Sequence, residues 1–584
     1  MKKLTRLIAI IFAVTMCATV TACGATEESN ATVVNIMNNG GGCGRIWLDN
    51  AIARFQEKIG DKSYAEGKQG VKFEIEHNIN TSTGTMGTSG YDIYFTTSDG
   101  YPRNLAQRGF LYDLTDFMNE KFYDDGKTSI LDKIDPDYLD VLKGTDGKFY
   151  AIPHEEWFPG LTYDADLFKA NNLYIAAPDE TNVRKYSCAY GSVNFVKDST
   201  AKKSLGNDGK PNTYDDGLPT TLVEFLVLCS KLKNDLSVTP FTVSGLNAQY
   251  TNYLTESLWA SLAGYDGFRR AYTFDGEMEI VTGYTNESLF KGINYKDDGD
   301  KLKAIYKPVT EKITLTEETG YHATSDVNKY YASAFMQVIY DEGWYSQDSS
   351  NQSAHTAAQS NFIFSGKNGK EKVAFMIEGD YWFNESVTVN NFRDYKTVYP
   401  NEPDRDLRWM PLPTSLDTPV TTEEEGRPNV LLDTGASFTF VNKRTASKTD
   451  GCLEAVKDFL KFIYSDEEMS HFTECTGLGK AAMNYRITEE DEAKMQEFKK
   501  SIWQLRRDNK VIYGSASNET FLSSPISFVP YQSSESNFYY LINGKLYICD
   551  LYAHRAGYGA RNCFPYTQKT LEQWKSIYRG SKTL

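Results

Sequence analysis

The chain has 584 residues and a formal net charge of −16, with 62 Lys and Arg against 78 Asp and Glu. Such an acidic chain lacks the basic footprint that a phosphate backbone requires, which argues against nucleic acid as a ligand. Its length exceeds what a single hydrophobic core usually fills, so two or more domains are expected.

The N-terminus has the pattern of a targeting signal. Three basic residues among the first six precede an apolar run that is too short to span a bilayer. The sequence VTACG at 20–24 resembles a bacterial lipobox. We therefore expect residues 1–22 to be a lipoprotein signal peptide, Cys23 to carry the acyl chains (palmitate among them), and 23–30 to be a tether. The alternative is a plain secretory signal with an accidental cysteine.

Seven further cysteines follow Cys23, at wide spacings and without a CxxC pair. This pattern supports neither a zinc site nor a dense disulfide scaffold, and it leaves any pairing open. The six histidines are also scattered without the spacing of metal ligands.

Strands and helices alternate along the first part of the chain. Strands are expected at 32–37, 71–77 and 91–96, and helices at 46–58 and 111–119. This alternation predicts an α/β fold with a parallel sheet.

Ligands of such sheets bind beyond the carboxyl ends of the strands, where Asn39 and Asp99 fall. Ordinary turn chemistry explains both residues equally well. The Gly-rich turn at 40–44 lacks the GxGxxG spacing of a dinucleotide loop, because position 45 is Arg.

A series of motifs then follows in a characteristic order. They are GKFYAIP at 147–153, GLTYDADLF at 160–168, LPTTLVEF at 218–225, KVAFMIEGDYW at 372–382 and MPLP at 410–413. In order and spacing they resemble family 1 of the extracellular solute-binding proteins, the class that includes maltose-binding protein. In that family, the motif that LPTTLVEF resembles marks the start of a helix.

The resemblance implies an α/β, two-lobed fold of the type II periplasmic-binding-protein kind, with an interlobe cleft and a hinge. One lobe is expected to hold 31–155 and 400–465, and the other 156–399 and 466–584. The expected crossings lie near Pro153–Gly160, Glu385–Pro411 and Tyr464–Glu474.

The resemblance also implies a function. We expect a monomeric binding protein that requires no cofactor, is lipid-anchored on the extracytoplasmic face of the cell membrane, and delivers an oligosaccharide to the membrane subunits of an ABC importer. Hinged closure of the lobes on the ligand is the expected mechanism. Peptide and polyol ligands stay open.

Sugar recognition needs flat apolar platforms and planar hydrogen-bonding groups. The resemblance places Trp157 and Trp382 at the cleft, although Trp is more often a core residue. The further candidates for ligand contact are Trp259, Trp344, Tyr381, Glu378, Asp99 and Asn39.

The sequence NDGKPNTYDD at 207–216 is rich in oxygen donors. A hard cation such as Ca²⁺ prefers oxygen ligands, so this loop is a candidate calcium site, although it lacks the final glutamate of an EF-hand. The candidate ligands are Asn207, Asp208, Thr213, Asp215 and Asp216. A solvent-exposed turn rich in Asp and Asn is the alternative.

The main rival function is a secreted glycoside hydrolase, which would pair Glu155 or Glu156 with Glu378. Any chain with 78 acidic residues permits such a pairing, and no HExxH, GxSxG or P-loop motif is present. A cell-wall scaffold or adhesin would favour internal repeats, which the sequence lacks.

Overall fold

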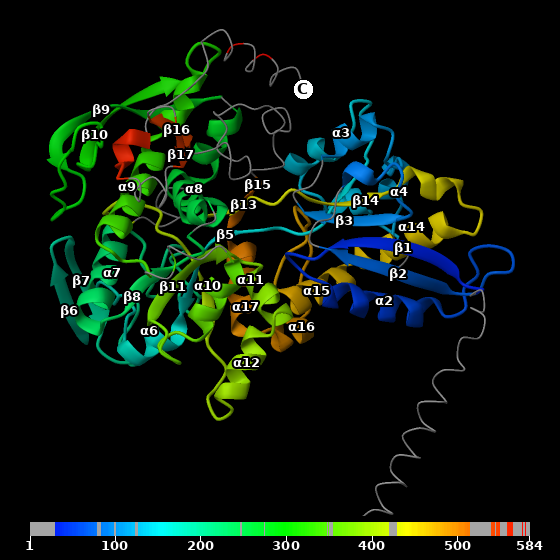
Figure 1. Cartoon of the computed structure of the whole chain (residues 1–584), viewed down its shortest axis with the longest axis horizontal. Coiled ribbons are helices and arrows are strands. Elements are labelled where there is room, and N and C mark those ends of the chain that lie inside the picture. The colour runs from blue at the N-terminus through cyan, green and yellow to red at the C-terminus, as the bar shows by residue number, and fades with distance from the viewer. Residues whose placement is uncertain are drawn as a thin grey trace, which may run out of the picture.

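The structure is a computed structural model. It describes residues 30–78, 83–97, 101–122, 126–245, 248–273, 275–346, 349, 354–419, 429–513, 539–542, 545–548, 557–563, 575 and 579. These residues form two lobes that lie side by side along the long axis (Figure 1). Cys23, the signal peptide and Asp99 lie outside the described residues. Within the described ranges, no helix is both long and apolar enough to cross a membrane.

The first lobe is built on a five-stranded sheet in the order β2-β1-β3-β14-β4. Its strands are β1 (Thr32–Asn39), β2 (Val71–Asn78), β3 (Ile93–Thr97), β4 (Ile152–Pro153) and β14 (Ser437–Val441). β1 pairs in parallel with both β2 and β3, whereas β14 is antiparallel to β3 and β4. β14, the last of these strands in the chain, therefore lies within the first-lobe sheet, between β3 and β4.

Helices cover this sheet. They are α2 (Ile46–Ile59), α3 (Pro102–Gln107), α4 (Thr115–Asn119), α5 (Ile130–Lys133), α14 (Cys452–Ile463) and α15 (Asp466–Thr476), with 3₁₀ turns at Thr83–Thr85, Pro136–Tyr138, Asp140–Leu142 and Lys443–Ser447. The short helix α16 (Glu489–Lys494) packs against α15. α14 shows why these segments are helical: Cys452, Val456, Phe459 and Ile463 are buried at intervals of three or four residues, so one face packs on the sheet.

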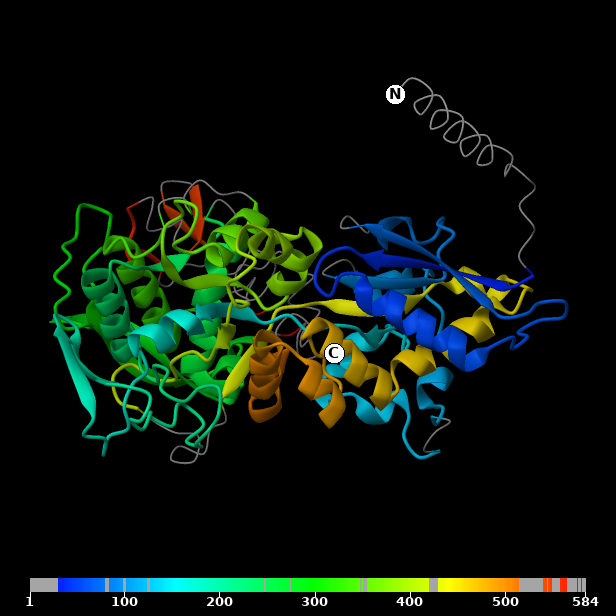
Figure 2. The same ribbon diagram turned by 90° about the horizontal axis from the view of Figure 1, so that it is seen from below.

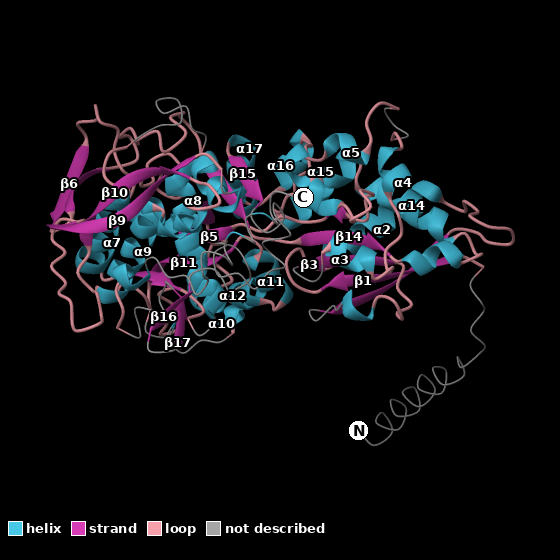
Figure 3. Cartoon of the chain, turned by 90° about the horizontal axis from the view of Figure 1, so that it is seen from above, coloured by secondary structure: helices cyan, strands magenta, loops and turns pink. Residues whose placement is uncertain are grey.

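The second lobe is built on a four-stranded sheet in the order β12-β5-β11-β8. Its strands are β5 (Pro159–Asp164), β8 (Thr239–Thr242), β11 (Val373–Gly379) and β12 (Leu407–Met410). β5 and β11 are buried at every residue, as expected for strands covered on both faces. Figure 3 shows β5 and β11 in the interior of the second lobe, with helices around them.

The other second-lobe elements surround this sheet. The helices are α6 (Ala165–Asn171), α7 (Leu222–Leu236), α8 (Ala248–Thr273), α9 (Val327–Asp341), α10 (His355–Ile363), α11 (Trp382–Thr388), α12 (Asn391–Val398) and α17 (Glu497–Asp508), with 3₁₀ turns at Gly320–Ser325 and Ala560–Cys563. Paired strands are β6 (Val183–Cys188) with β7 (Gly191–Val196), β9 (Glu277–Ser288) with β10 (Tyr306–Thr314), β13 (Val430–Asp433) with β15 (Lys510–Tyr513), and β16 (Tyr539–Ile542) with β17 (Lys545–Ile548).

Helix α7 begins as its sequence motif predicts. The Thr221 hydroxyl accepts the backbone N–H of Glu224, and the Glu224 carboxylate accepts the N–H of Thr221. This capping box satisfies donors that the first turn of a helix leaves free.

The α/β, two-lobed fold expected from the sequence is confirmed, but two lobe boundaries are wrong. β12 was expected in the first lobe and pairs with β5 of the second lobe. α15 was expected in the second lobe and packs against α2 of the first. The second and third crossings therefore lie later in the chain than expected, and the orange segment that holds α15 to α17 occupies the junction of the lobes (Figure 2).

The expected helix at 111–119 is also partly wrong. Only Thr115–Asn119 is helical, because Leu111 forms a β-bridge with Asn442.

Candidate functional site

Three stretches of chain connect the lobes and are hydrogen-bonded to one another. They are 154–158 between β4 and β5, 434–436 between β13 and β14, and 477–496 between α15 and α17. The N–H of Thr434 donates to the carbonyl of Trp157 at 3.0 Å, and the N–H of Glu156 donates to the carbonyl of Gly479 at 3.1 Å. A few such residues at the ends of elements are what a hinge between two rigid bodies requires.

An aromatic contact joins the first connection to the second lobe. The rings of Trp157 and Tyr381 are 4.7 Å apart between centroids, at an interplanar angle of 45°. Tyr381 follows β11, and its hydroxyl lies 2.8 Å from that of Tyr253 on α8. The sequence names Trp157 and Tyr381 as candidates, and the structure brings them together.

Side chains also link the lobes on either side of this contact. The Tyr265 hydroxyl on α8 donates to the Asp137 carboxylate at 2.8 Å. The amide of Asn384 on α11 donates to the carbonyl of Thr476 at 2.9 Å. The two lobes therefore touch through polar contacts that a hinge rotation can break and remake.

Three buried carboxylates gather around the first connection. One oxygen of Asp433 accepts the N–H of Trp157 at 3.0 Å, and one oxygen of Asp380 accepts the N–H of Phe158 at 3.0 Å. Asp433, Asp380 and Glu156 are at most 1% exposed, and the second oxygen of each has no hydrogen-bond partner among the described residues. Buried oxygens without a donor are costly, so they suit hydroxyl or water donors.

Burial sets the protonation of this group. Desolvation raises the pKa of Asp380 and of Asp433 well above the usual carboxyl range, and the nearby charge of Glu156 adds to both shifts. The N–H donors from Phe158 and Trp157 oppose these shifts. A protonated carboxyl both donates and accepts a hydrogen bond, which is the capacity that a hydroxylated ligand matches.

Arg506 balances the charge of Glu156. Its Nε lies 2.5 Å from Glu156 Oε1, with the Glu156 side chain fully buried and that of Arg506 12% exposed. The same guanidinium donates to the carbonyl of Met483 at 3.0 Å. Arg506 lies on α17, so its two contacts tie this second-lobe helix to the first and the third connection.

Glu378 and Asn39 do not join the Trp157–Tyr381 contact through any hydrogen bond described here. One oxygen of Glu378 accepts the N–H of Gly379 at 3.0 Å, and burial raises its pKa well above the usual range. The side-chain oxygen of Asn39 accepts the N–H of Gly41 at 2.8 Å. Asn39 therefore fits the alternative of turn chemistry. Glu378 lies at the end of β11, shortly before Tyr381.

The other three tryptophan candidates are core residues. Trp382 is fully buried, contacts Phe362, Phe383 and Phe498, and donates its indole N–H to Thr162 at 2.9 Å. The prediction that it is an accessible platform is wrong, because aromatic packing around α11 encloses it. Trp259 donates to Asp326 at 2.6 Å, and Trp344 lies against Tyr190, both in the core of the second lobe.

The Asp-rich loop closes on itself. The Asp215 carboxylate accepts the N–H of Asp208 at 3.0 Å and the hydroxyl of Thr213 at 2.6 Å. The Asp216 carboxylate accepts the N–H of Asn212 at 2.7 Å, and the Asn207 amide donates to the carbonyl of Leu412 at 2.8 Å. These are the bonds of the turn alternative, and calcium binding here stays a prediction.

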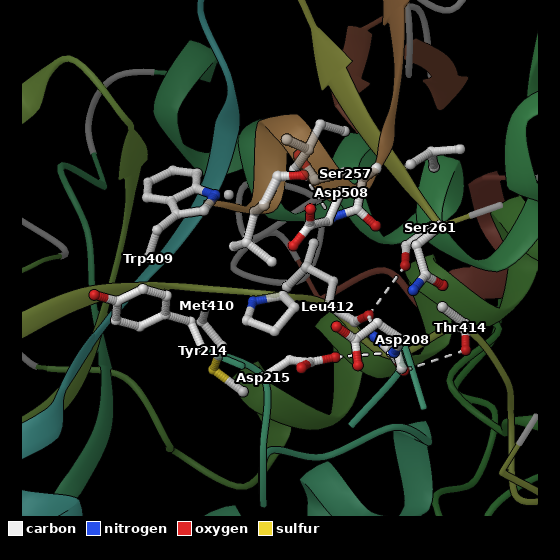
Figure 4. A pocket seen from close by; sticks show the side chains of 18 of the residues that line it. Asp208, Tyr214, Asp215, Ser257, Ser261, Trp409, Met410, Leu412, Thr414 and Asp508 are labelled. Carbon is white, nitrogen blue, oxygen red and sulfur yellow. Dashed lines mark hydrogen bonds between the residues drawn. The ribbon is translucent and has the colours of Figure 1, made fainter. Parts of the chain in front are cut away.

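A small pocket lies between this loop and β12. Figure 4 shows Asp208, Asp215, Trp409 and Leu412 around it. Its volume of about 40 Å³ is far below the several hundred Å³ of usual small-molecule sites. It suits water rather than a solute.

A wider groove of about 770 Å³ runs beside the third connection. Tyr485 and Trp503 line it with ring centroids 5.4 Å apart, together with the arginines Arg486, Arg506 and Arg507. The sequence gives no expectation of a groove here. This groove is large enough for a solute.

Several residues of the junction were missed from the sequence. Asp433, Arg506 and Tyr253 lie in segments without a recognisable motif. Asp433 and Arg506 are 276 and 350 residues from their partners in the first connection, and Tyr253 is 128 residues from Tyr381. Their only sequence signal is the polar residue type within an apolar stretch, such as Asp433 after VLL.

The chain was compared with known proteins in three ways. No family model matches the sequence, and no curated protein matches it. Among solved structures, it is similar to a chitin oligosaccharide binding protein at 13% identity, covering 95% of this chain and 100% of that one, with a TM-score of 0.49.

Two further similar structures have comparable values. A family 1 extracellular solute-binding protein from Bifidobacterium longum subsp. infantis is 13% identical, with 95% and 100% coverage and a TM-score of 0.42. Maltose-bound MalE3 from T. maritima is 14% identical, with 95% and 100% coverage and a TM-score of 0.44. The chain is thus similar over nearly its whole length to solute-binding proteins, at TM-scores below 0.5 that by themselves carry no argument about function.

Proposed function

We propose that this chain is the extracytoplasmic solute-binding protein of an ABC importer, that Cys23 anchors it by lipid, and that it captures a carbohydrate by hinged closure of its lobes. The observation that carries the proposal is the junction itself. Two separate sheets are joined by three connections, and an aromatic pair and buried carboxylates lie where those connections meet.

The chemistry of this junction suits a hydroxylated ring. Trp157 and Tyr381 offer flat faces with polar edges, and Asp380, Asp433 and Glu156 offer oxygens that lack donors. Rotation at the connections would part the Trp157–Tyr381 contact and admit a sugar between the lobes. Ligand contacts to both lobes would then favour the closed form, because only that form makes both sets of contacts.

We propose no catalysis for this protein. A hydrolase would need two carboxylates that face a bond from either side. Glu156 is neutralised by Arg506, and Glu378 accepts its own neighbouring N–H. No observation favours the hydrolase alternative over binding.

A thermal-shift screen of the purified protein against mono- and oligosaccharides tests the proposal. A ligand that binds only the folded form raises Tm with concentration once that concentration exceeds Kd. Each mixture is then analysed for cleaved sugar. A rise in Tm with intact sugar supports binding; a rise accompanied by cleavage supports the hydrolase; and no rise with any saccharide rejects a carbohydrate ligand.

A further inference from the structure

A second cluster of reactive side chains lies in the first lobe, beside the first connection. It consists of Cys43, on the loop after β1, with His154 and Glu155. One potential ligand atom from each residue lies within 4.8 Å of the other two. The Cys43 sulfur is 3.8 Å from His154 Nε2, and the three residues are 6%, 1% and 1% exposed.

The chain is shaped to bring these residues together. The N–H of Cys43 donates to Glu155 Oε2 at 2.7 Å. Gly42 has φ +61, and a Cβ there would lie 2.5 Å from Glu155 Oε1. Only glycine allows both this backbone conformation and this approach, so the Gly-rich loop closes directly over the carboxylate.

The three groups are a thiol, an imidazole and a carboxylate, which are the three ligand types that zinc takes in proteins. Zn–S and Zn–N bonds at a tetrahedral angle place sulfur and nitrogen roughly 3.6 Å apart. The 3.8 Å between the Cys43 sulfur and His154 Nε2 is close to that separation. All three of these side chains are buried, and each offers a different type of ligand atom.

Neighbouring side chains hold the imidazole in place. The ring packs against Trp47 and Phe95, with centroids 5.3 Å and 4.8 Å away. Lys480 Nζ lies 3.2 Å from His154 Nδ1, so Nε2 is the ring nitrogen that faces Cys43. These contacts fix the plane of the ring and its direction toward the thiol.

We propose that Cys43, His154 and Glu155 form a zinc site that fastens the loop after β1 to the first connection between the lobes. When zinc binds, the Cys43 thiol loses its proton to solvent and a Zn–S bond forms, with no change of oxidation state. Three protein ligands leave one position of a tetrahedral site for water. The sequence concealed this site, because Cys43 and His154 are 111 residues apart and match no spacing motif.

Metal titration of the purified, reduced and chelator-treated protein tests the proposal. One equivalent of Zn²⁺ should remain bound after dialysis and raise Tm. Co²⁺ should replace it and give a thiolate-to-cobalt charge-transfer absorption with the visible bands of a tetrahedral site. Cys43→Ser should remove the charge-transfer absorption and weaken zinc binding by more than the roughly 10- to 100-fold lost with an outer contact.

Cys229→Ser is the matched control, because Cys229 is a free, buried cysteine of the second lobe. It should keep both the zinc and the cobalt spectrum. If Cys43→Ser does not fold, the zinc binding of Glu155→Gln and the cobalt spectrum of the wild type test the site instead. No retained zinc, or a thiolate–cobalt spectrum that survives in folded Cys43→Ser, would overturn the proposal.

Discussion

The ring of Trp157 lies 4.7 Å from the ring of Tyr381, and this contact joins the first interlobe connection to the end of β11. Trp157 is held at its backbone by Asp433 and Thr434 from the second connection. Tyr381 is held at its hydroxyl by Tyr253 of α8. The pair therefore spans the two bodies whose relative rotation the proposed function needs.

Replacing Trp157 by alanine should weaken saccharide binding. Loss of one stacking face is expected to lower affinity at least about tenfold, which corresponds to 1.4 kcal/mol. Isothermal titration calorimetry with a ligand from the thermal-shift screen measures the change. Arg486→Ala, which alters only the groove beside the third connection, is the control, and it should bind as the wild type does. A larger loss of affinity in Arg486→Ala than in Trp157→Ala would instead place the saccharide site in that groove.

Replacing Trp382 by alanine should instead destabilise the fold. Its ring is fully buried among aromatic side chains, and removing such a ring costs about 3–5 kcal/mol of unfolding free energy. Urea unfolding measures this loss. The protein that remains folded should bind saccharide with unchanged affinity, and a selective loss of affinity at unchanged stability would restore Trp382 as a platform.

Replacing Arg506 by alanine should leave Glu156 as a buried charge without a partner. Such a loss costs about 3–5 kcal/mol of unfolding free energy. Adding Glu156→Gln to the same protein should recover part of it, because the stranded charge is gone. Arg507→Ala is the matched control, since Arg507 pairs with Asp508 at the surface and exposed pairs contribute about 0–1 kcal/mol. Equal losses of unfolding free energy in Arg506→Ala and Arg507→Ala would show that the buried Glu156–Arg506 pair matters no more than an exposed pair.

The raised pKa of Asp380 predicts a specific pH dependence of stability. Burial, and then the charges of Glu156 and Asp433, raise its pKa in the folded protein. A carboxyl with a raised folded pKa binds protons more tightly in the folded than in the unfolded protein, so its contribution is complete below the ordinary carboxyl pKa and is lost as the pH rises through the raised value.

The Tm of the wild type should therefore fall between mildly acidic and mildly alkaline pH, and Asp380→Asn should make this fall smaller. Asparagine keeps an oxygen for the Phe158 N–H and has no proton to lose. Asp116→Asn, at an exposed position of α4, should follow the wild-type curve. A wild-type slope that Asp380→Asn leaves unchanged would contradict the assignment.

Calcium removal tests the Asp-rich loop at 207–216. Desolvation raises the pKa of Asp208 to about 6, and the charge of Asp215 adds to it. A bound cation would relieve that repulsion. On the calcium hypothesis, a chelator lowers Tm, added Ca²⁺ restores it, and Asp215→Asn abolishes the response. A Tm indifferent to calcium would leave the loop as a turn closed by its own hydrogen bonds.

Local patterns predicted most of the individual elements. The apolar alternation of 71–77 became β2, and the Thr221 and Glu224 capping pair began α7 where the motif placed it. Such patterns are local, so a single stretch of chain contains the information. The boundary errors arose where pairing is not local: nothing within 407–410 indicates that this strand joins β5.

The site was predicted less well than the fold. Trp157 and Tyr381 were both named, because Tyr381 lies in a motif that the family resemblance supplied and Trp157 lies between two such motifs, where the resemblance places the cleft. The prediction for Trp382 was wrong, because the sequence does not distinguish a tryptophan that faces a cleft from one that is buried in the core behind it. Asp433 and Arg506 reach the junction only through tertiary packing across the lobes.

Small-angle X-ray scattering during a saccharide titration tests the central claim most directly. With a ligand identified by the screen, the radius of gyration should fall in a saturable way as the lobes close, and the sugar should be recovered intact. A saccharide that binds with no change in the radius of gyration, or one that is returned as cleaved products, would contradict capture by hinged closure.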